Sequence, residues 1–437
     1  MTHTLDDLRA LVRGRVLLPG DAGFDPARRP WNLAVEQHAA AVVEAADAAD
    51  AAALVKYAGA RGLSVFPQPS GHGATGDLAG AILLRTGQLG EVRVDPAART
   101  ARVGAGAPWG RVQEAAAEHG LTGLAGSSPA VTVTGYTLGG GLSWFGRAHG
   151  WAADSVVAFD VVDAEGGPAR VTADSDPDLF WALRGGGGDF ALVTAVEFRL
   201  YPAAALFGGR MLWPADRAPA VLAAFRSITA HAPGELTLWL DLLRFPGSAP
   251  LVAVDATYLG DEAGGRALGA PLDGIGGLIS DSRGVMPPSA LGSITAEPTD
   301  PGPGLSRGEL LTGLDDTAAG ILLSRPIDPL LSVQVRHLGG ALARPSSGPH
   351  GALAEPYSLY LFGVPSTPPV AAAIRDRQRD LAGALAPYVS GRKPYTYLAP
   401  GESASSAFAP EVLDRLRALK RERDPRAVFR SNFPVLA

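Results

Sequence analysis

The spacing of hydrophobic residues changes along the chain, and each spacing predicts a kind of element. Residues 39–60 form an alanine-rich run with apolar positions at helical spacing, which predicts one or two helices. This run leads into residues 63–66, which are expected to form a strand. Residues 109–119 predict another helix, ended at Gly120. Small β and α units thus alternate, as in an α/β nucleotide-binding domain.

Shorter apolar runs complete this first region. They predict strands at 92–94, 100–103 and 191–200, a hairpin from 155–163 and 169–172, and a short helix at 178–183. Residues 124–150, in contrast, are mostly Gly, Ser, Thr and Pro with little helix or strand signal. A stretch this long is uncommon in a compact domain unless it holds a ligand.

The pattern changes near Tyr201 and Pro202. Residues 203–390 hold β-like runs and helical runs, interrupted by a Gly/Pro-rich connector at 280–308, which predicts a second, mixed α+β domain. The β-like runs lie at 236–243, 251–258, 331–336 and 358–364, and the helical runs lie at 218–230 and 370–385. The last segment, 408–433, predicts a charged helix closed by Asp424-Pro425.

Composition narrows the classes of protein that this pattern allows. At about 150 residues per domain, 437 residues suggest two or three compact units. The 55 glycines and 36 prolines are spread between apolar runs, so they predict many tight turns. No cysteine is present, which excludes disulfides, thiolate catalysis and thiolate metal sites.

Charge and hydropathy exclude two kinds of partner. The net charge is −6 and no block of Lys or Arg occurs, so nucleic-acid binding is not expected. No stretch approaches the roughly 20 apolar residues that a membrane span needs. We therefore expect a cytoplasmic protein with a small-molecule substrate, and the sequence leaves the oligomeric state open.

Several glycine-rich segments are candidates for a binding site. His72 lies in Pro-Ser-Gly-His-Gly-Ala-Thr-Gly at 69–76, where the glycines allow another body to approach the backbone; taken alone, this could be a surface turn. Residues 126–141 offer many backbone N–H groups and hydroxyls, enough to wrap a pyrophosphate without lysine, although an ordinary loop fits equally. Residues 178–194 join a helix, four glycines and a strand, which brings backbone close to a flat or anionic ligand.

Other chemistries match the sequence poorly. Gly104, Gly106 and Gly110 suggest a dinucleotide fingerprint, but their spacing is G-x-G-x-x-x-G and no acidic ribose partner follows about 20 residues later. No G-x-S-x-G elbow, phosphate loop or H-E-x-x-H motif occurs, and the eight histidines are scattered, so no metal site is expected.

Together and in this order, the motifs resemble the berberine-bridge-enzyme-like flavoproteins of the vanillyl-alcohol-oxidase/p-cresol-methylhydroxylase fold family. The matching pieces are 71–73, 126–141, 178–194 and the tail from Tyr397 to Asn432. The resemblance implies an α+β fold: an FAD-binding domain at 1–202 to which 391–437 return, and a substrate domain at 203–390 with an antiparallel sheet flanked by helices.

The resemblance also implies how the cofactor is held. His72 matches the histidine that bonds to the 8α-methyl carbon of FAD, although Ser70 and Gly73 depart from the usual Gly-Gly-His-Ser. Ser128 matches the cysteine that forms a second bond in many relatives, so a single link is expected. Val131 matches a position that controls access of dioxygen. The other expected cofactor contacts are Ser70, Gly71, Gly73, Gly135, Gly139, Gly140, Gly141, Leu192, Val193 and Asn432.

Tyr397 matches the tyrosine of the family's Tyr-x-Asn and is the candidate catalytic base. A tyrosine has a pKa near 10, so this role needs a nearby positive charge or donor; Arg392 and Lys393 are close in sequence. Ala399 replaces the usual Asn, and Asp189 and Ala191 replace Asn and Gly in the usual Gly-Asn-Phe-Gly.

The function that the resemblance implies is an FAD-dependent oxidase. An alcohol, sugar or secondary-metabolite substrate would pass a hydride to flavin N5, and dioxygen would be the acceptor. The departures from the family pattern motivate an alternative, a flavin-containing binding or cyclisation template with little redox turnover. A nicotinamide dehydrogenase is a third hypothesis.

The substrate domain carries a second set of expectations. Its few charged clusters predict a largely apolar pocket. Tyr357 and Tyr360 are three residues apart on one expected strand, so they should point to opposite faces. Tyr136 and His149 border the glycine-rich run and are candidates either for the pocket or for structural roles.

Overall fold

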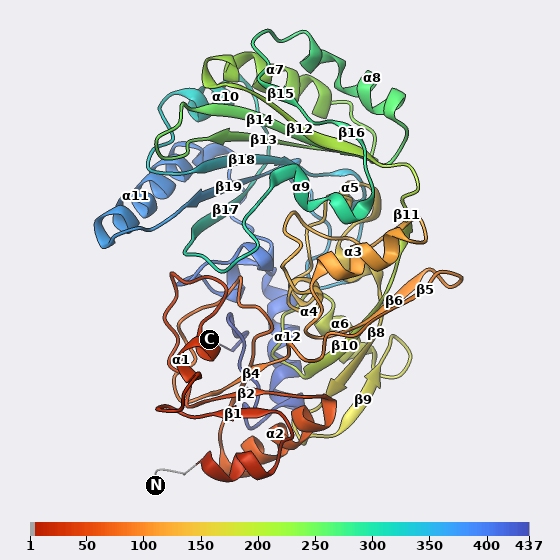
Figure 1. Cartoon of the computed structure of the whole chain (residues 1–437), viewed down its shortest axis with the longest axis vertical. Coiled ribbons are helices and arrows are strands. Elements are labelled where there is room, and N and C mark those ends of the chain that lie inside the picture. The colour runs from red at the N-terminus through yellow and green to blue at the C-terminus, as the bar shows by residue number, and fades with distance from the viewer. Residues whose placement is uncertain (1–4, 437) are drawn as a thin grey trace.

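The computed structural model describes residues 5–436 and has two halves, one above the other in Figure 1. The lower half contains a four-stranded sheet, β1-β2-β4-β3, and a five-stranded sheet, β5-β6-β10-β8-β9. The upper half contains an eight-stranded sheet of order β15-β12-β14-β13-β18-β19-β17, with β16 also pairing with β12. The α+β class predicted from the sequence is confirmed.

The four-stranded sheet is mixed, because β1 pairs antiparallel with β2 whereas β2, β4 and β3 are parallel. Its strands are Arg15–Leu17 (β1), Ala41–Glu44 (β2), Val65–Pro67 (β3) and Ile82–Arg85 (β4). The prediction of helix throughout 39–60 is wrong at β2. Val42 and Val43 are β-branched and fully buried on opposite faces of that strand. Helix α2 spans Ala48–Arg61, so it begins after the strand, and Asp47 caps its N-terminus.

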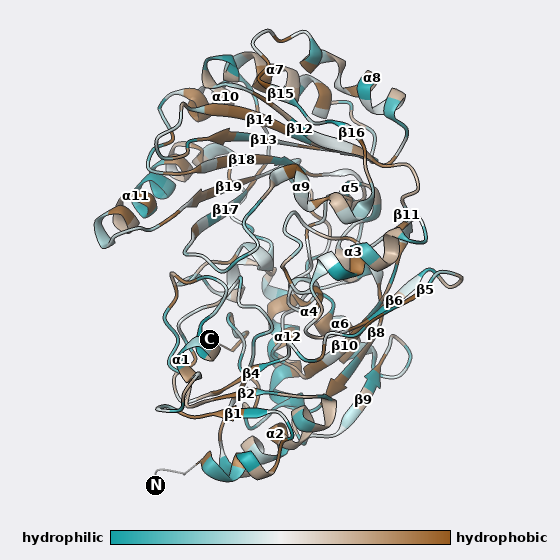
Figure 2. Ribbon diagram, viewed as in Figure 1, coloured by the Kyte–Doolittle hydropathy of each residue, from teal (hydrophilic) through white to brown (hydrophobic). Residues whose placement is uncertain are grey.

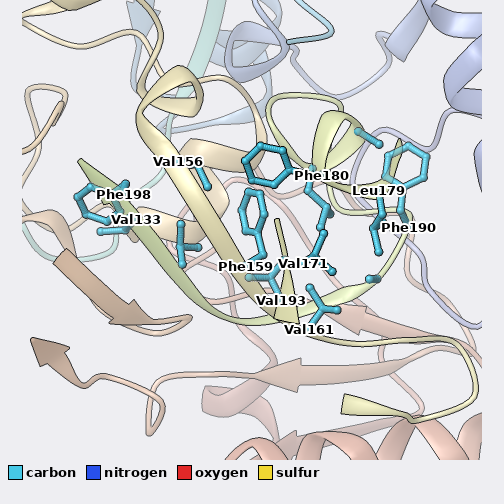
Figure 3. Close-up of a cluster of buried hydrophobic side chains, with 14 of the residues drawn as sticks. Val133, Val156, Phe159, Val161, Val171, Leu179, Phe180, Phe190, Val193 and Phe198 are labelled. Atoms are coloured by element: carbon cyan, nitrogen blue, oxygen red, sulfur yellow. The ribbon is translucent and has the colours of Figure 1, made fainter. Parts of the chain in front are cut away.

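The five-stranded sheet is antiparallel and carries the predicted hairpin. Its strands are Val92–Asp95 (β5), Thr100–Gly104 (β6), Val156–Val162 (β8), Pro168–Val171 (β9) and Leu192–Arg199 (β10). Helix α6 (Pro177–Leu183) packs its Phe180 against Phe159 of β8, and Figure 3 shows these side chains in one buried cluster. Helix α3 (Trp109–Ala117) covers the same core, as its apolar spacing predicted.

Most of residues 124–150 is irregular, as expected, but two short helices lie within it. They are Val133–Leu138 (α4) and Gly146–His149 (α5). Arg147 of α5 is buried, and its guanidinium donates to backbone carbonyls of Leu236, Leu338, Ala232 and Pro233. These bonds tie the glycine-rich run to the upper sheet.

The upper sheet is antiparallel and buries both faces at its centre. Its main strands are Phe207–Pro214 (β12), Leu236–Leu243 (β13), Leu251–Tyr258 (β14), Leu305–Leu311 (β17), Ser332–His337 (β18) and Tyr357–Gly363 (β19). The edge pieces are Ser280–Asp281 (β15) and Gly284–Val285 (β16). β12 and β17 were not expected, because glycines interrupt the apolar run of β12 and charged residues that of β17.

Helices cover the outer face of the upper sheet. They are Ala218–Thr229 (α7), Glu262–Asp273 (α8), Asp316–Leu323 (α10) and Pro368–Ala384 (α11). In Figure 1, α7, α8 and α10 lie above the sheet, and α11 lies at its left, level with β18 and β19. Their apolar sides form one core with alternate residues of the strands, such as Leu238, Leu240 and Val335. Figure 2 shows brown strands beneath partly teal helices. The opposite face of the sheet points to the lower half.

The C-terminal segment returns to the lower half, where α12 (Pro410–Arg423) and the C-terminus lie in Figure 1. Lys420, buried, donates to the carbonyls of Asp189 and Phe429 and pairs with Asp424 at 2.6 Å. Phe429 in turn bridges to Val65 of β3. Within residues 5–436, no helix is long and apolar enough to span a bilayer.

Candidate functional site

The loop after β3 presents His72 in a confined setting. Gly71 has a φ of +88°, and a Cβ there would lie 2.8 Å from Pro30, so this turn requires glycine. The His72 ring stacks on Trp31 with 4.2 Å between ring centroids, and the Ser70 hydroxyl lies 2.9 Å from Nδ1. Burial lowers the pKa of His72 to about 4, so its imidazole is neutral at pH 7.

His72 leaves one ring nitrogen without a partner. Nε2 is buried and meets no hydrogen-bond partner in residues 5–436, and the backbone N–H groups of His72 and Gly73 also meet no protein acceptor there. A buried polar atom without a partner is rare and needs an explanation. A neutral imidazole nitrogen of this kind fits the carbon–nitrogen bond that the resemblance implies, and free N–H groups fit an anionic cofactor.

The C-terminal segment reaches the same loop through Asn432. Its side-chain oxygen accepts the Thr75 N–H at 2.9 Å, three residues beyond His72. Arg430, two residues earlier, donates to Asp77 and to the carbonyl of Ala79. The fold therefore brings Asn432 and His72, 360 positions apart, into one site.

The glycine-rich run at 126–141 holds the next group of predicted contacts. Ser128 is 9% exposed, and its hydroxyl accepts the Ala130 N–H at 3.4 Å; Val131 packs against the lower core. Gly135 is exposed on α4. Ser128 stands where the resemblance places a second link to the cofactor, and a hydroxyl there forms no thioether.

Neighbouring side chains account for the three glycines that end this run. A Cβ at Gly139 would lie 2.8 Å from Thr396, one at Gly140 2.6 Å from His350, and one at Gly141 2.5 Å from Tyr136. Gly140 and Gly141 also have φ values of +97° and +77°. These residues offer a ligand only their backbone, and part of it is already bonded: the Gly140 N–H donates to the Thr137 carbonyl, and the carbonyls of Gly140 and Gly141 accept from Ala153 and Ala152.

The four glycines at 185–188 have the same explanation at three positions. Cβ atoms at Gly185, Gly186 and Gly187 would lie within 2.9 Å of His350, the Ala182 carbonyl and Tyr395, respectively. At Gly188 the nearest atom is 3.8 Å away and φ is unremarkable, so an alanine fits. In β10, the predicted contacts Leu192 and Val193 are buried in two cores of the lower half. Their side chains are therefore committed to packing.

Tyr397 lies under the inner face of the upper sheet. Its ring packs on Gly308 of β17, where a Cβ would come within 2.5 Å, and its hydroxyl lies 3.2 Å from that of Ser358 on β19. The ring of Tyr360 is 5.7 Å away. Gly308, which has no side chain, thus makes room on β17 for the candidate base.

The cation near Tyr397 is Arg336, which sequence reasoning did not identify. Its Cζ is 6.0 Å from the centroid of the Tyr397 ring, 5.1 Å from that of Tyr360 and 4.1 Å from that of Trp239. The two candidates close in sequence are engaged elsewhere: Arg392 donates to carbonyls, and Lys393 pairs with carboxylates.

An ion network holds the loop that carries Tyr397. Lys393, buried, contacts Glu402 at 2.5 Å and Glu309 of β17 at 3.3 Å. The other carboxylate oxygen of Glu402 accepts the Ala399 N–H at 3.0 Å. Glu402 therefore contacts Lys393, which precedes Tyr397, and Ala399, which follows it. The bond to the Ala399 N–H holds the backbone at the position where the family has Asn.

More charged groups lie on the same face of the sheet, so the expectation of a largely apolar pocket is wrong for this face. Asp255 of β14 is fully buried and forms a two-bond pair with Arg210 of β12. Asp241 of β13 accepts the Ser332 hydroxyl at 2.6 Å, and burial raises its pKa to about 7. In the β13 sequence Leu-Thr-Leu-Trp-Leu-Asp-Leu-Leu, apolar residues of one face alternate with the residues of the other face. Asp241 is the residue that could have indicated a charged face.

The remaining candidates from the sequence are Tyr357, Tyr360, His149 and Tyr136. Tyr360 faces Tyr397, whereas the Tyr357 hydroxyl lies 2.7 Å from that of Thr229 in the outer core, so the prediction of opposite faces is confirmed. His149 stacks on Tyr201 at 3.9 Å, which is a packing role. The Tyr136 hydroxyl is buried without a protein partner in the described residues, and burial raises its pKa well above 10.

Comparison with known proteins agrees with this geometry. Residues 39–172 match the model of an FAD binding domain. The chain is 27% identical over 464 aligned residues to (R)-6-hydroxynicotine oxidase of Paenarthrobacter nicotinovorans, covering 97% of each chain. Among solved structures, 6-hydroxy-D-nicotine oxidase from Arthrobacter nicotinovorans superposes with a TM-score of 0.81 at 25% identity, covering 98% of each chain.

A second structure shows the same fold at lower identity. The BBE-like 1 protein of Physcomitrella patens superposes with a TM-score of 0.86 at 20% identity, over 99% of both chains. The matched FAD domain contains the His72 loop and the 126–141 run, and the superpositions include the upper sheet. The chain is therefore an FAD-linked oxidoreductase that is similar in sequence to (R)-6-hydroxynicotine oxidase and has the fold of the BBE-like proteins.

Proposed function

We propose that this protein is an FAD-dependent oxidase whose flavin is attached through His72 alone and which oxidises an alcohol, sugar or secondary-metabolite substrate with dioxygen as acceptor. The observation that carries the proposal is the buried, unpartnered Nε2 of a neutral His72 in a loop tied to the C-terminal segment. The absence of any cysteine supports a single link.

The proposal divides the chain by role. Residues 1–202 with 391–437 would hold FAD through His72, the backbone around Gly71 and Gly73, the 126–141 run and Asn432. Residues 203–390 would hold the substrate against the inner face of the upper sheet. Bound FAD would supply a two-electron acceptor that dioxygen can reoxidise.

Tyr397 would take a proton from the substrate hydroxyl. Its own hydroxyl has the Ser358 hydroxyl as a hydrogen-bond partner, and the Arg336 guanidinium is a positive charge close to its ring. Glu402 and Lys393 would keep the loop in place. Because positioning alone can supply roughly 7 to 11 kcal/mol, this network is part of catalysis.

The test is the fate of the yellow colour in acid. Denatured wild-type protein should retain its flavin in the pellet, whereas His72→Ala should release it to the supernatant. His231→Ala is the control, because that histidine is exposed on the outer side of the molecule. A yellow wild type that loses its flavin to the supernatant would contradict the link, and a colourless protein would contradict the function.

A further inference from the structure

The guanidinium of Arg336 carries a charge that its protein neighbours do not pair. Its Nε donates to Gln334 at 2.5 Å, but within residues 5–436 no carboxylate lies within 4.0 Å of it, and its Nη groups donate to no protein acceptor. The neighbouring acid Asp255 is already paired with Arg210. Arg336 is half-buried, and nearby Tyr397, Glu297 and Tyr360 outweigh desolvation and raise its pKa, so it stays charged.

A charge in this position is costly unless something compensates it. Placing an ion in a protein interior costs several kcal/mol, and a cation–π contact such as that with Trp239 restores only about 0.5–2 kcal/mol. Arg210 on the same face, in contrast, has its partner Asp255 within the protein. We infer that Arg336 recognises an oxyanion of the substrate, a carboxylate or its equivalent, on an aromatic or otherwise planar molecule.

The surroundings specify the rest of that molecule. Trp239, itself stacked on Trp144 at 3.5 Å, Tyr360 and Tyr397 surround the guanidinium with aromatic rings. A guanidinium binds a carboxylate with two parallel hydrogen bonds, and aromatic walls favour a flat body. Since Cζ is 6.0 Å from the ring of the proposed base, the acid group would lie only a few bonds from the oxidised carbon.

This inference rests on the proposed function, because it names the substrate class of the same site. It differs from a role of Arg336 in assisting Tyr397 alone, since that role requires no anion in the ligand. It also differs from a role toward the flavin, whose reduced form carries negative charge. The experiment must separate these three.

The experiment titrates the yellow holoenzyme with benzoate and with its neutral counterpart benzamide, followed by calorimetry at constant ionic strength. Wild type should bind benzoate saturably and more tightly than benzamide. Arg336→Met should weaken benzoate binding at least about 30-fold, as expected for removing one partner of a buried charge pair, and change benzamide binding less than threefold.

Two variants keep the result interpretable. Arg336→Lys retains the charge without the two-bond geometry and should lie between wild type and Arg336→Met, which guards against a folding defect. Arg392→Met removes an equal charge whose bonds go to the carbonyls of His350 and Ala352, and it should leave benzoate binding unchanged.

Three outcomes would overturn the inference. One is a wild type that does not bind benzoate, or binds it no better than benzamide. Another is unchanged benzoate affinity in Arg336→Met with slower substrate oxidation, which would leave Arg336 as a partner of Tyr397. The last is unchanged benzoate affinity in Arg336→Met together with a lower flavin midpoint potential. This result would mean that the anion stabilised by Arg336 is the reduced flavin. A colourless protein would instead defeat the proposed function itself.

Discussion

In the lower half of the molecule the candidate site is lined by backbone, whereas in the upper half it is lined by charged and aromatic side chains. Around Gly140 and Gly185, side chains such as His350 fill the space where a Cβ would stand. On the upper sheet, Asp241 and Arg336 project from strands whose alternate residues form an apolar core. The lower half is therefore sensitive to added atoms, and the upper half to changes of charge.

The two halves also suit different ligand parts. Backbone N–H groups meet an anion without depending on a particular side chain, which fits a cofactor that the whole family shares. Side chains on strands can be exchanged without disturbing the sheet, so they fit a substrate that differs among relatives.

The largest effect is expected from the addition of one methyl group in the lower half. Gly140→Ala places a Cβ 2.6 Å from His350 at a φ of +97°, which should destabilise the protein by about 3 kcal/mol or more. Thermal unfolding of the purified protein measures this. The control is Gly188→Ala, which should change stability by no more than about 0.5 kcal/mol. Equal melting temperatures for both variants would break the contrast.

In the upper half, removal of the Tyr397 hydroxyl oxygen should slow the reaction and leave the free energy of unfolding nearly unchanged. Tyr397→Phe should slow anaerobic flavin reduction by about 10²-fold, because the proton acceptor is lost, while the protein stays yellow. Stopped-flow absorbance measures the rate. Tyr388→Phe, at a surface tyrosine that donates to Asp315, is the control. No reduction of wild type by any bound ligand would favour the template alternative.

Asp241 should give the upper half a pH dependence. Its folded pKa of about 7 exceeds the usual 3.8, so the folded state binds the proton more tightly, and stability should fall as pH rises from about 4 to 7. The groups facing it are Arg210, Arg336, Asp255, Ser332 and Gln334.

Asp241→Asn should remove this contribution and be more stable than wild type at pH 8, by up to about 4 kcal/mol, since the rise in pKa from 3.8 to about 7 is worth ~1.4 kcal/mol per unit. Urea unfolding at pH 5 and pH 8 measures the difference. The exposed Asp216→Asn is the control. A stability difference that does not depend on pH would show that Asp241 titrates normally.

The smallest effect is expected from the loop that carries Tyr397. Glu402→Gln keeps the shape but loses the charge that pairs with Lys393, so Tyr397 should be held less firmly and kcat should fall about tenfold with KM little changed. Steady-state kinetics measured across a range of pH would give kcat and show whether its pH profile also shifts. Glu411→Gln, exposed on α12, should have no effect, and an equal loss there would point to a general defect.

Sequence reasoning succeeded where the local pattern decides the structure. Strands β13 and β14 lie at the predicted residues, because each alternates apolar side chains over eight positions. It failed at β2, where two valines inside an alanine-rich run pair with β4, and at β12, whose glycines conceal a strand. In both cases pairing with distant strands outweighed local propensity.

The sequence by itself was enough to predict the lower half of the candidate site and the likeness to a family, because glycine turns around His72 and at 126–141 are local features that appear in order. Only the tertiary structure decided which cation faces Tyr397. Arg336 is 61 positions from Tyr397, whereas Arg392 and Lys393 are five and four positions from it. The register of β18 with β13 and β19 brings Arg336 against the rings of Trp239 and Tyr360. Charge proximity depends on strand pairing, and no local pattern encodes that pairing.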